Sequence, residues 1–243
     1  MRRRLVRVAR VGVAMSALLG LVAMVRYPGG DPLDRTATRY ALSRNFLSDL
    51  GMTVAWNGQA NRIGAALFAA SVLLLVVSVL IILAGLMRTL TRIASARTYA
   101  KAAGLVGLMT ATAFIVVALT PEDRLMAVHV QATLLAFRLV PVAVALLAVA
   151  AWCGGERQRR NAIVLSGLTT LLVLYAAFLD WGPSTASLAG LHANVIAQKA
   201  VAIVLVAAFL FLSTAISGAG DESNPRFRDA PQLPTRSADG PWG

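Results

Sequence analysis

The stretch IGAALFAASVLLLVVSVLIILAGLM, residues 63–87, contains no charged side chain. A helix needs about 20 apolar residues to cross the hydrocarbon core of a bilayer, so this stretch predicts a membrane span. Apolar stretches of similar length, bounded by charged or turn residues, lie before and after it. Together the predicted spans are residues 8–25, 63–87, 102–119, 128–152, 162–179 and 193–216. Six spans predict an all-α integral membrane bundle that extends over residues 1–216.

The composition of the chain excludes a soluble globular protein. Of the 243 residues, 58% are hydrophobic and 14% are charged, and the mean hydropathy is +0.70. Soluble domains carry about 25% charged residues. The single cysteine, Cys153, rules out an intramolecular disulfide and a cysteine-rich metal site.

The basic residues indicate how the spans are oriented. Lys and Arg number 23 against 11 Asp and Glu, which gives a net charge of +12. Three basic clusters flank the spans, in residues 2–10, 88–101 and 157–160. Because basic loops stay on the cytoplasmic side, the clusters predict that both termini are cytoplasmic. They lack the aromatic-basic pattern of a nucleic-acid groove, so the predicted partner is the lipid bilayer and not nucleic acid.

The first span has a second interpretation as a cleaved signal peptide, because arginines precede an apolar stretch. The sequence Tyr27-Pro28-Gly29-Gly30 that follows is not a small-x-small cleavage site. We therefore expect an uncleaved anchor.

Two segments lie outside the predicted spans. Residues 26–62, on the predicted outer side, are too long for a simple connection and carry a helical pattern from Thr36 to Leu50 that ends at Gly51. We expect a packed outer cap with one short helix. Residues 217–243 contain four prolines and few apolar residues, which predicts a disordered cytoplasmic tail.

Two cations fall within the predicted spans, Arg138 in the fourth and Lys199 in the sixth. A charge at mid-span costs about 2.5 to 3.5 kcal/mol, and no carboxylate lies in the middle of a span to pair with either. At helical spacing Arg138 shares a face with Gln131, and Lys199 shares one with His192. With Asp180, which ends the fifth span, these residues predict an outward-facing polar cavity that binds a lipid headgroup or another anionic or zwitterionic ligand.

An alternative explanation of both cations remains open. Each side chain could extend to the membrane surface, or bond to backbone carbonyls that Pro141 frees in the fourth span. The cations would then have no ligand.

Acidic and imidazole side chains gather on the predicted outer side. His129 opens the fourth span, His192 opens the sixth, and Asp49 precedes the second. These three residues are candidate ligands for a divalent metal, although their spacing matches no diagnostic pattern. An acid paired with His129 could also act as an acid-base pair, and ordinary interfacial polarity is the third interpretation.

Short motifs resemble a known family. Residues 45–51 read NFLSDLG and are followed by Asn61, and residues 121–123 read PED ahead of His129. Over residues 27–212 the chain resembles a bacterial six-helix membrane family, the domain of unknown function nine-nine-eight. The resemblance implies six helices in a bacterial inner membrane. Its polar positions are Ser48, Asp49, Asp123 and His129, which are the candidate catalytic residues, but it implies no reaction.

A more distant resemblance is to membrane lipid hydrolases of the alkaline ceramidase type, which use a Ser, an Asp and three His around zinc. This chain has only His129 and His192, so Asp49 or Asp123 would have to replace the third His. A membrane-embedded lipid hydrolase, with or without a metal, is therefore the alternative to ligand binding. A small-solute transporter is the third hypothesis, and the sequence leaves open whether the protein is an enzyme and how many copies assemble.

Overall fold

The computed structural model describes residues 2–218, which form a bundle of six long helices and contain no β-strand. These helices are α1 (Arg2–Arg26), α2 (Arg62–Leu90), α3 (Arg97–Leu119), α4 (Glu122–Cys153), α5 (Arg159–Trp181) and α6 (Leu188–Gly218). Each is long and apolar enough to cross a membrane, so the structure confirms a helix at each of the six predicted spans. The predicted tail lies, from residue 219 onward, outside the described residues.

Helix α4 begins earlier than the predicted start at residue 128. Pro121 stands before it, where its fixed φ and missing N–H suit the entry to a helix, and Glu122 and Asp123 in the first turn complement the helix dipole. The first turn is not continuous with the rest, because Leu125 has non-helical backbone angles, φ −129° and ψ 44°. On the N-terminal side of this kink, Glu122 Oε2 lies 4.0 Å from Nε2 of His129 in the same helix.

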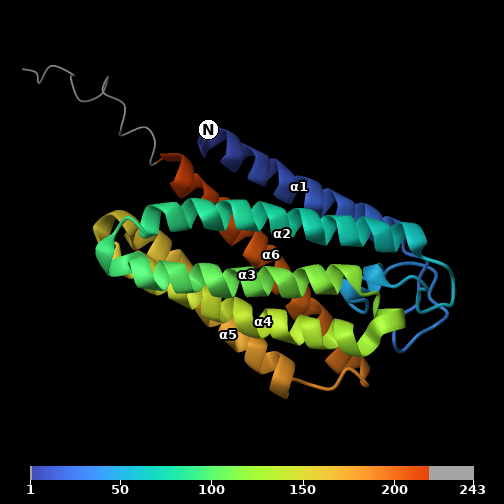
Figure 1. Ribbon diagram of the computed structural model, residues 1–243. Helices are drawn as coiled ribbons and strands as arrows, with labels where there is room; N and C mark the ends of the chain where they lie inside the picture. The colour runs from blue at the N-terminus through green and yellow to red at the C-terminus, as the bar shows by residue number, and fades with distance from the viewer. Residues whose placement is uncertain (1, 219–243) are drawn as a thin grey trace, which may run out of the picture.

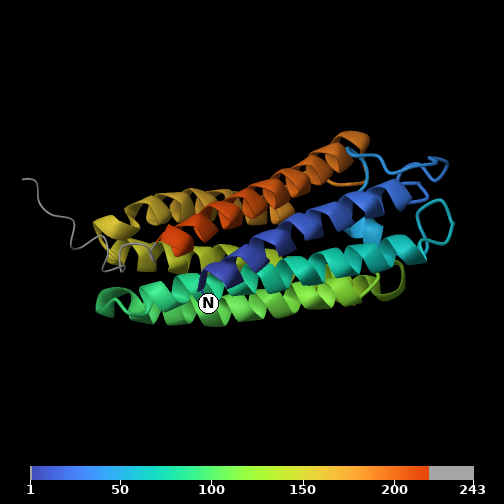
Figure 2. The same ribbon diagram turned by 90° about the horizontal axis from the view of Figure 1, so that it is seen from above.

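Neighbouring helices in the chain are neighbours in space. Figures 1 and 2 show α1 to α5 following one another through the bundle and α6 returning to contact α5, α1 and α2. The start of α1, the end of α6 and the connections 91–96 and 154–158 lie at one end of the bundle. Residues 27–61, 120–121 and 182–187 lie at the other end. All three basic clusters therefore share one end.

The interior of the bundle is apolar and closely packed. Large side chains from four helices meet in one cluster, including Ile82, Leu147, Leu172 and Leu212. Small residues let backbones approach: a Cβ on Gly12 of α1 would fall 2.2 Å from the Ser78 hydroxyl of α2. Close approach of this kind favours helix association in lipid, where apolar burial alone supplies little driving force.

The segment of residues 27–61, which we call the cap, covers the end of the bundle away from the basic clusters. The helix predicted over residues 36–50 does not form; its one helical turn is the 3₁₀ helix η1 (Ser48–Gly51). The reason is local. The Asn45 side chain accepts from the Ala41 amide and the Asp49 side chain accepts from the Phe46 amide, so side chains take hydrogen bonds that a helix would have given to its backbone.

The cap folds tightly where it leaves α1. Gly30 has φ +80°, and a Cβ there would lie 2.4 Å from the backbone nitrogen of Asn57. Only glycine fits such a left-handed position in close contact with another backbone segment. The turn brings residues 55–58 against residues 28–30, with the Asn57 side chain donating to the Pro28 carbonyl at 2.9 Å.

Candidate functional site

Asp49 lies at the centre of a polar cluster between the cap and the bundle. Its side chain is buried, with 1% of the residue exposed. One carboxylate oxygen, Oδ2, accepts from Asn45 Nδ2 at 2.8 Å and from the Phe46 amide at 3.0 Å. The other oxygen, Oδ1, is buried without a hydrogen-bond partner. Burial raises the Asp49 pKa to about 7, and the nearby charge of Glu122 adds to this effect.

Two asparagines hold the cap together from inside. Asn45 is fully buried, donates to the Gly30 carbonyl and to Asp49, both at 2.8 Å, and accepts from the Ala41 amide at 2.9 Å. Asn61 donates to the carbonyls of residues 50 and 52 at 3.1 Å and 2.8 Å. Both asparagines belong to the sequence motif that Asp49 occupies. Much of that motif therefore builds the cap itself.

Three aromatic side chains, of Tyr27, Tyr40 and Trp56, lie near the Asp49 carboxylate. The rings of Tyr27 and Tyr40 meet edge to face with centroids 5.8 Å apart. Burial and the charge of Asp49 raise the pKa of both phenols, so both stay neutral. The indole N–H of Trp56 lies close enough to the carboxylate to oppose the rise in the Asp49 pKa. The surroundings of Asp49 are thus polar, and they include one positive charge, the Lys199 ammonium.

Helix α6 supplies two side chains that hold the cap. The Lys199 ammonium donates to the Asn45 carbonyl and lies 5.3 Å from the centroid of the Tyr40 ring. Next to it, Gln198 accepts from the Leu47 amide at 2.8 Å. Lys199, predicted to bind a ligand, therefore contacts the cap.

Glu122 and His129 form a second part of the cluster at the start of α4. His129 Nδ1 lies 2.7 Å from the Thr120 carbonyl, and His129 Nε2 lies 4.0 Å from Glu122 Oε2. Neither Nε2 nor Oε2 has a hydrogen-bond partner, although both atoms are buried. The side chains of His129 and Glu122 are 4% and 16% exposed, so both are largely buried.

Asp123 joins the cap to the start of α4. Its carboxylate accepts from the Thr53 amide at 2.8 Å, the Thr53 hydroxyl at 2.6 Å and the Val54 amide at 3.1 Å. Arg124 donates to the same Thr53 hydroxyl at 2.8 Å. Through these hydrogen bonds Asp123 attaches residues 53–54 of the cap to the start of α4, which is a structural role.

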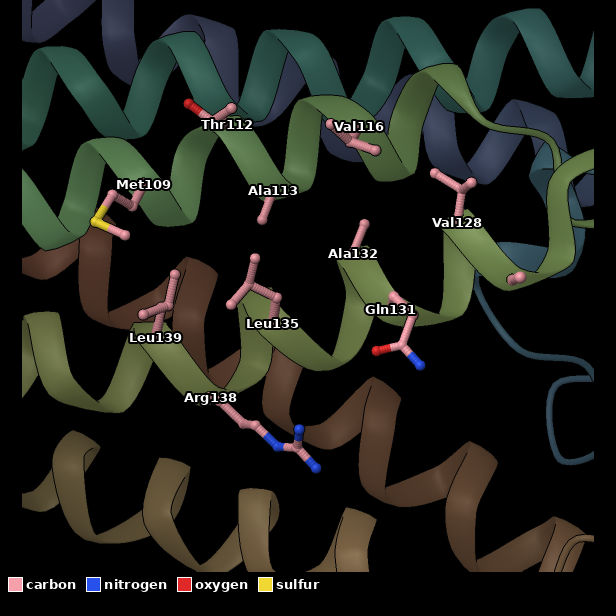
Figure 3. A pocket seen from close by; sticks show the side chains of 11 residues that line it. Met109, Thr112, Ala113, Val116, Val128, Gln131, Ala132, Leu135, Arg138 and Leu139 are labelled. Carbon is pink, nitrogen blue, oxygen red and sulfur yellow. The ribbon is translucent and has the colours of Figure 1, made fainter.

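Arg138 and Lys199 have different partners. Arg138 forms an ion pair with Asp180 at 2.7 Å, and the two side chains are 55% and 38% exposed. Asp180 lies at the end of α5. The long side chain of Arg138 extends away from α3 (Figure 3) and thereby reaches this carboxylate from the middle of α4. The structure therefore brings together two of the predicted ligand-binding residues, Arg138 and Asp180.

A groove of about 850 Å³ lies between α3 and α4. Ala113 of α3 and Ala132 of α4 both point into the space between the two helices (Figure 3). Gln131 and Arg138 lie on the α4 side, and the Arg138 head points away from α3. The other lining side chains are mostly apolar: Met109, Val116, Ala127, Val128, Leu135 and Leu139, with Thr112 as the further polar group.

The remaining predicted residues are not part of one joint site. Ser48 is half-buried in η1, and His192 is half-buried near the start of α6. Within the described part of the chain, no three His, Cys, Asp or Glu side chains are grouped to hold a metal ion. The proposed metal set of His129, His192 and Asp49 is therefore not assembled.

Several residues of the cluster were not singled out from the sequence. Tyr40, Trp56 and Gln198 carry no motif of their own, and their roles depend on which segments meet. Glu122 belongs to the PED motif of residues 121–123, but the backbone kink between it and His129 has no sequence signal beyond Pro121. The adjacent polar pair Gln198-Lys199 within an apolar span is the one signal that could have indicated a contact with the cap.

Two arrangements thus stand out: the buried cluster under the cap, and the groove beside the Arg138–Asp180 pair. The first is closed and rich in unpaired acceptors, and the second is open and apolar. No protein-family model matches this chain, and neither a curated protein nor a solved structure is significantly similar to it.

Proposed function

We propose that this protein is a multi-pass protein of the bacterial cell membrane that binds a zwitterionic phospholipid on its outer half. The cap faces outward in this proposal, and the end of the bundle with the basic clusters faces the cytoplasm. Support comes from the distribution of charge, because three basic clusters share one end of the bundle and basic segments resist translocation.

Cys153 provides a test of this orientation. It is the sole cysteine, is partly exposed, and ends α4 at the basic end of the bundle. A membrane-impermeant maleimide should leave it unlabelled on intact cells and label it after permeabilisation. A cysteine introduced at the exposed Ser43 of the cap is the matched control and should react on intact cells. Labelling of Cys153 on intact cells would reverse the orientation.

The α3–α4 groove carries the lipid proposal. It lies on two apolar spans, is open at the surface of the bundle, and has small side chains, Ala113 and Ala132, on both helices that line it. A surface groove in hydrocarbon has no water to fill it, so the acyl chain of a bilayer lipid is its natural occupant. Its apolar side chains complement such a chain along its length.

The ion pair beside the groove favours a zwitterionic headgroup. Arg138 and Asp180 are both more than one third exposed, so each retains hydrogen-bonding capacity toward a ligand. A phosphate would bond to the guanidinium, and an ammonium group would bond to the carboxylate. An anionic lipid would use Arg138 alone and be repelled by Asp180.

Native mass spectrometry of the purified protein with added phosphatidylethanolamine tests this binding. The wild type should retain the lipid, whereas each of two substitutions should weaken retention about tenfold. Arg138→Gln removes a charged hydrogen bond to the headgroup, and Ala132→Trp fills the space for the acyl chain. Arg92→Gln, an exposed arginine at the other end of the bundle, is the control and should bind as the wild type does. Equal retention by wild type, Arg138→Gln and Ala132→Trp would contradict the proposal.

A further inference from the structure

Within residues 2–218, six buried side-chain atoms near the cap have no hydrogen-bond partner, and three of them have a complementary group close by. The free oxygen of Asp31 lies 3.2 Å from the Arg44 guanidinium, and the indole N–H of Trp56 lies near the Asp49 carboxylate without forming a hydrogen bond to it. Glu122 Oε2 and His129 Nε2 are different, because they face each other at 4.0 Å and neither has a donor. In this pair two acceptor atoms lie close together, and no donor stands between them.

The tautomer of His129 follows from its other contact. A carbonyl oxygen only accepts, so the 2.7 Å contact with Thr120 requires the proton on Nδ1. The neutral ring then presents a bare lone pair on Nε2 toward the carboxylate of Glu122. Protonating Nε2 would not repair this contact, because 4.0 Å is too long for a hydrogen bond between the two atoms.

The spacing of the two acceptors indicates what fits between them. A nitrogen or oxygen about 2.8 Å from each atom would see them at an angle of about 90°, which one donor with two hydrogens spans. A transition metal about 2.1 Å from each would see them at roughly 145°, far from a tetrahedral angle. The gap therefore suits a bridging N–H or O–H donor better than a directly bound metal.

The charge around the gap favours a cation over water. The carboxylates of Asp49 and Glu122 are close enough for Glu122 to raise the Asp49 pKa. The neighbouring phenols of Tyr27 and Tyr40 are neutral, and the Lys199 ammonium of α6 donates to the cap backbone and interacts with the charge of Asp49, which leaves Glu122 without a cation of its own among these groups. A positive ligand would reduce the repulsion between the carboxylates, which a neutral water leaves in place.

We propose that Glu122 and His129 form a binding site for a primary ammonium group, with Asp49 supplying a further negative charge. The ammonium donates one N–H to Glu122 Oε2 and one to His129 Nε2. The kink at Leu125 and the anchoring of His129 on Thr120 hold the two acceptors in place. The site is separate from the α3–α4 groove, because neither Glu122 nor His129 lines that groove.

Calorimetric titration of the purified wild type with methylammonium chloride tests the site directly. Tetramethylammonium, which has no N–H, is the matched control ligand. Methylammonium should bind and tetramethylammonium should not. Glu122→Gln should weaken methylammonium binding by at least about tenfold. Glu156→Gln, whose side chain is 82% exposed in the connection between α4 and α5, should leave it unchanged.

A second arm identifies where the ammonium comes from. The titration is repeated in nanodiscs of phosphatidylethanolamine and of phosphatidylcholine. Suppressed methylammonium binding in phosphatidylethanolamine alone assigns the ammonium to a lipid headgroup, and equal binding in both lipids assigns it to a free amine. Equal affinity for the two soluble ions, no binding of either ion in phosphatidylcholine, or no effect of Glu122→Gln would overturn the site. The wild-type comparison does not depend on the folding of any variant.

Discussion

Replacing Asn45 with alanine is expected to lower the free energy of opening the cap by about 3 kcal/mol. The substitution removes two bonds that the side chain donates, to the Gly30 carbonyl and to Asp49, and one that it accepts from the Ala41 amide. All three groups would be left with fewer partners in a buried place. The cost is large because one of them is a carboxylate that keeps only the Phe46 amide as a donor.

Hydrogen exchange of the cap amides measures this effect. Protection across residues 41–50 should fall roughly hundredfold in Asn45→Ala, while the amides of α2 and α4 stay protected. Ser43→Ala, an exposed substitution in the same turn, is the control and should exchange like the wild type. If the two variants exchanged alike, Asn45 would not be the residue that holds the cap.

The cap is also expected to lose stability as the pH rises, through Asp49. In the folded protein the pKa of Asp49 is about 7, against 3.8 for a free carboxyl. Because the folded state holds the proton more tightly, the stability that depends on this proton is complete below about pH 4. It is lost as the pH rises toward 7, by roughly 4 kcal/mol in total, since each pKa unit corresponds to about 1.4 kcal/mol.

Asp49→Asn should remove most of this dependence, because asparagine is neutral at every pH. Cap exchange, corrected for the intrinsic effect of pH on exchange, should be slow at pH 4.5 and faster at pH 7.5 in the wild type. In Asp49→Asn the corrected protection should differ little between the two conditions. A wild-type cap that is better protected at pH 7.5 would reverse the sign and refute the prediction.

The cap links helices that are far apart in the chain. Asp123 of α4 bonds to Thr53, and Gln198 and Lys199 of α6 bond to residues 47 and 45. Loosening the cap would therefore release the start of α4, which carries Glu122 next to Asp123. For this reason the proposed ammonium site should respond to changes in the cap, although its two acceptors lie on α4.

The membrane spans could be predicted from the sequence because the bilayer imposes one requirement on every spanning segment. A backbone in hydrocarbon must satisfy its own hydrogen bonds, so each long apolar stretch becomes a helix whatever its neighbours are. The stretch of residues 63–87 is the clearest case, and it forms most of α2. The cap was harder, because its residues face water, lipid and protein together, and the predicted helix over residues 36–50 gave way to side-chain bonds from Asn45 and Asp49.

The sequence by itself determined the number of spans and the residues that bear polar groups near their ends. Only the tertiary structure decided which of those groups meet: Arg138 with Asp180, Glu122 with His129, and Lys199 with the cap. The physical reason is the distance along the chain over which each property is set. The length of an apolar stretch belongs to one segment and can be read from the sequence. A pairing between polar side chains depends on a kink, a side-chain length or a turn that brings distant segments within a few ångströms.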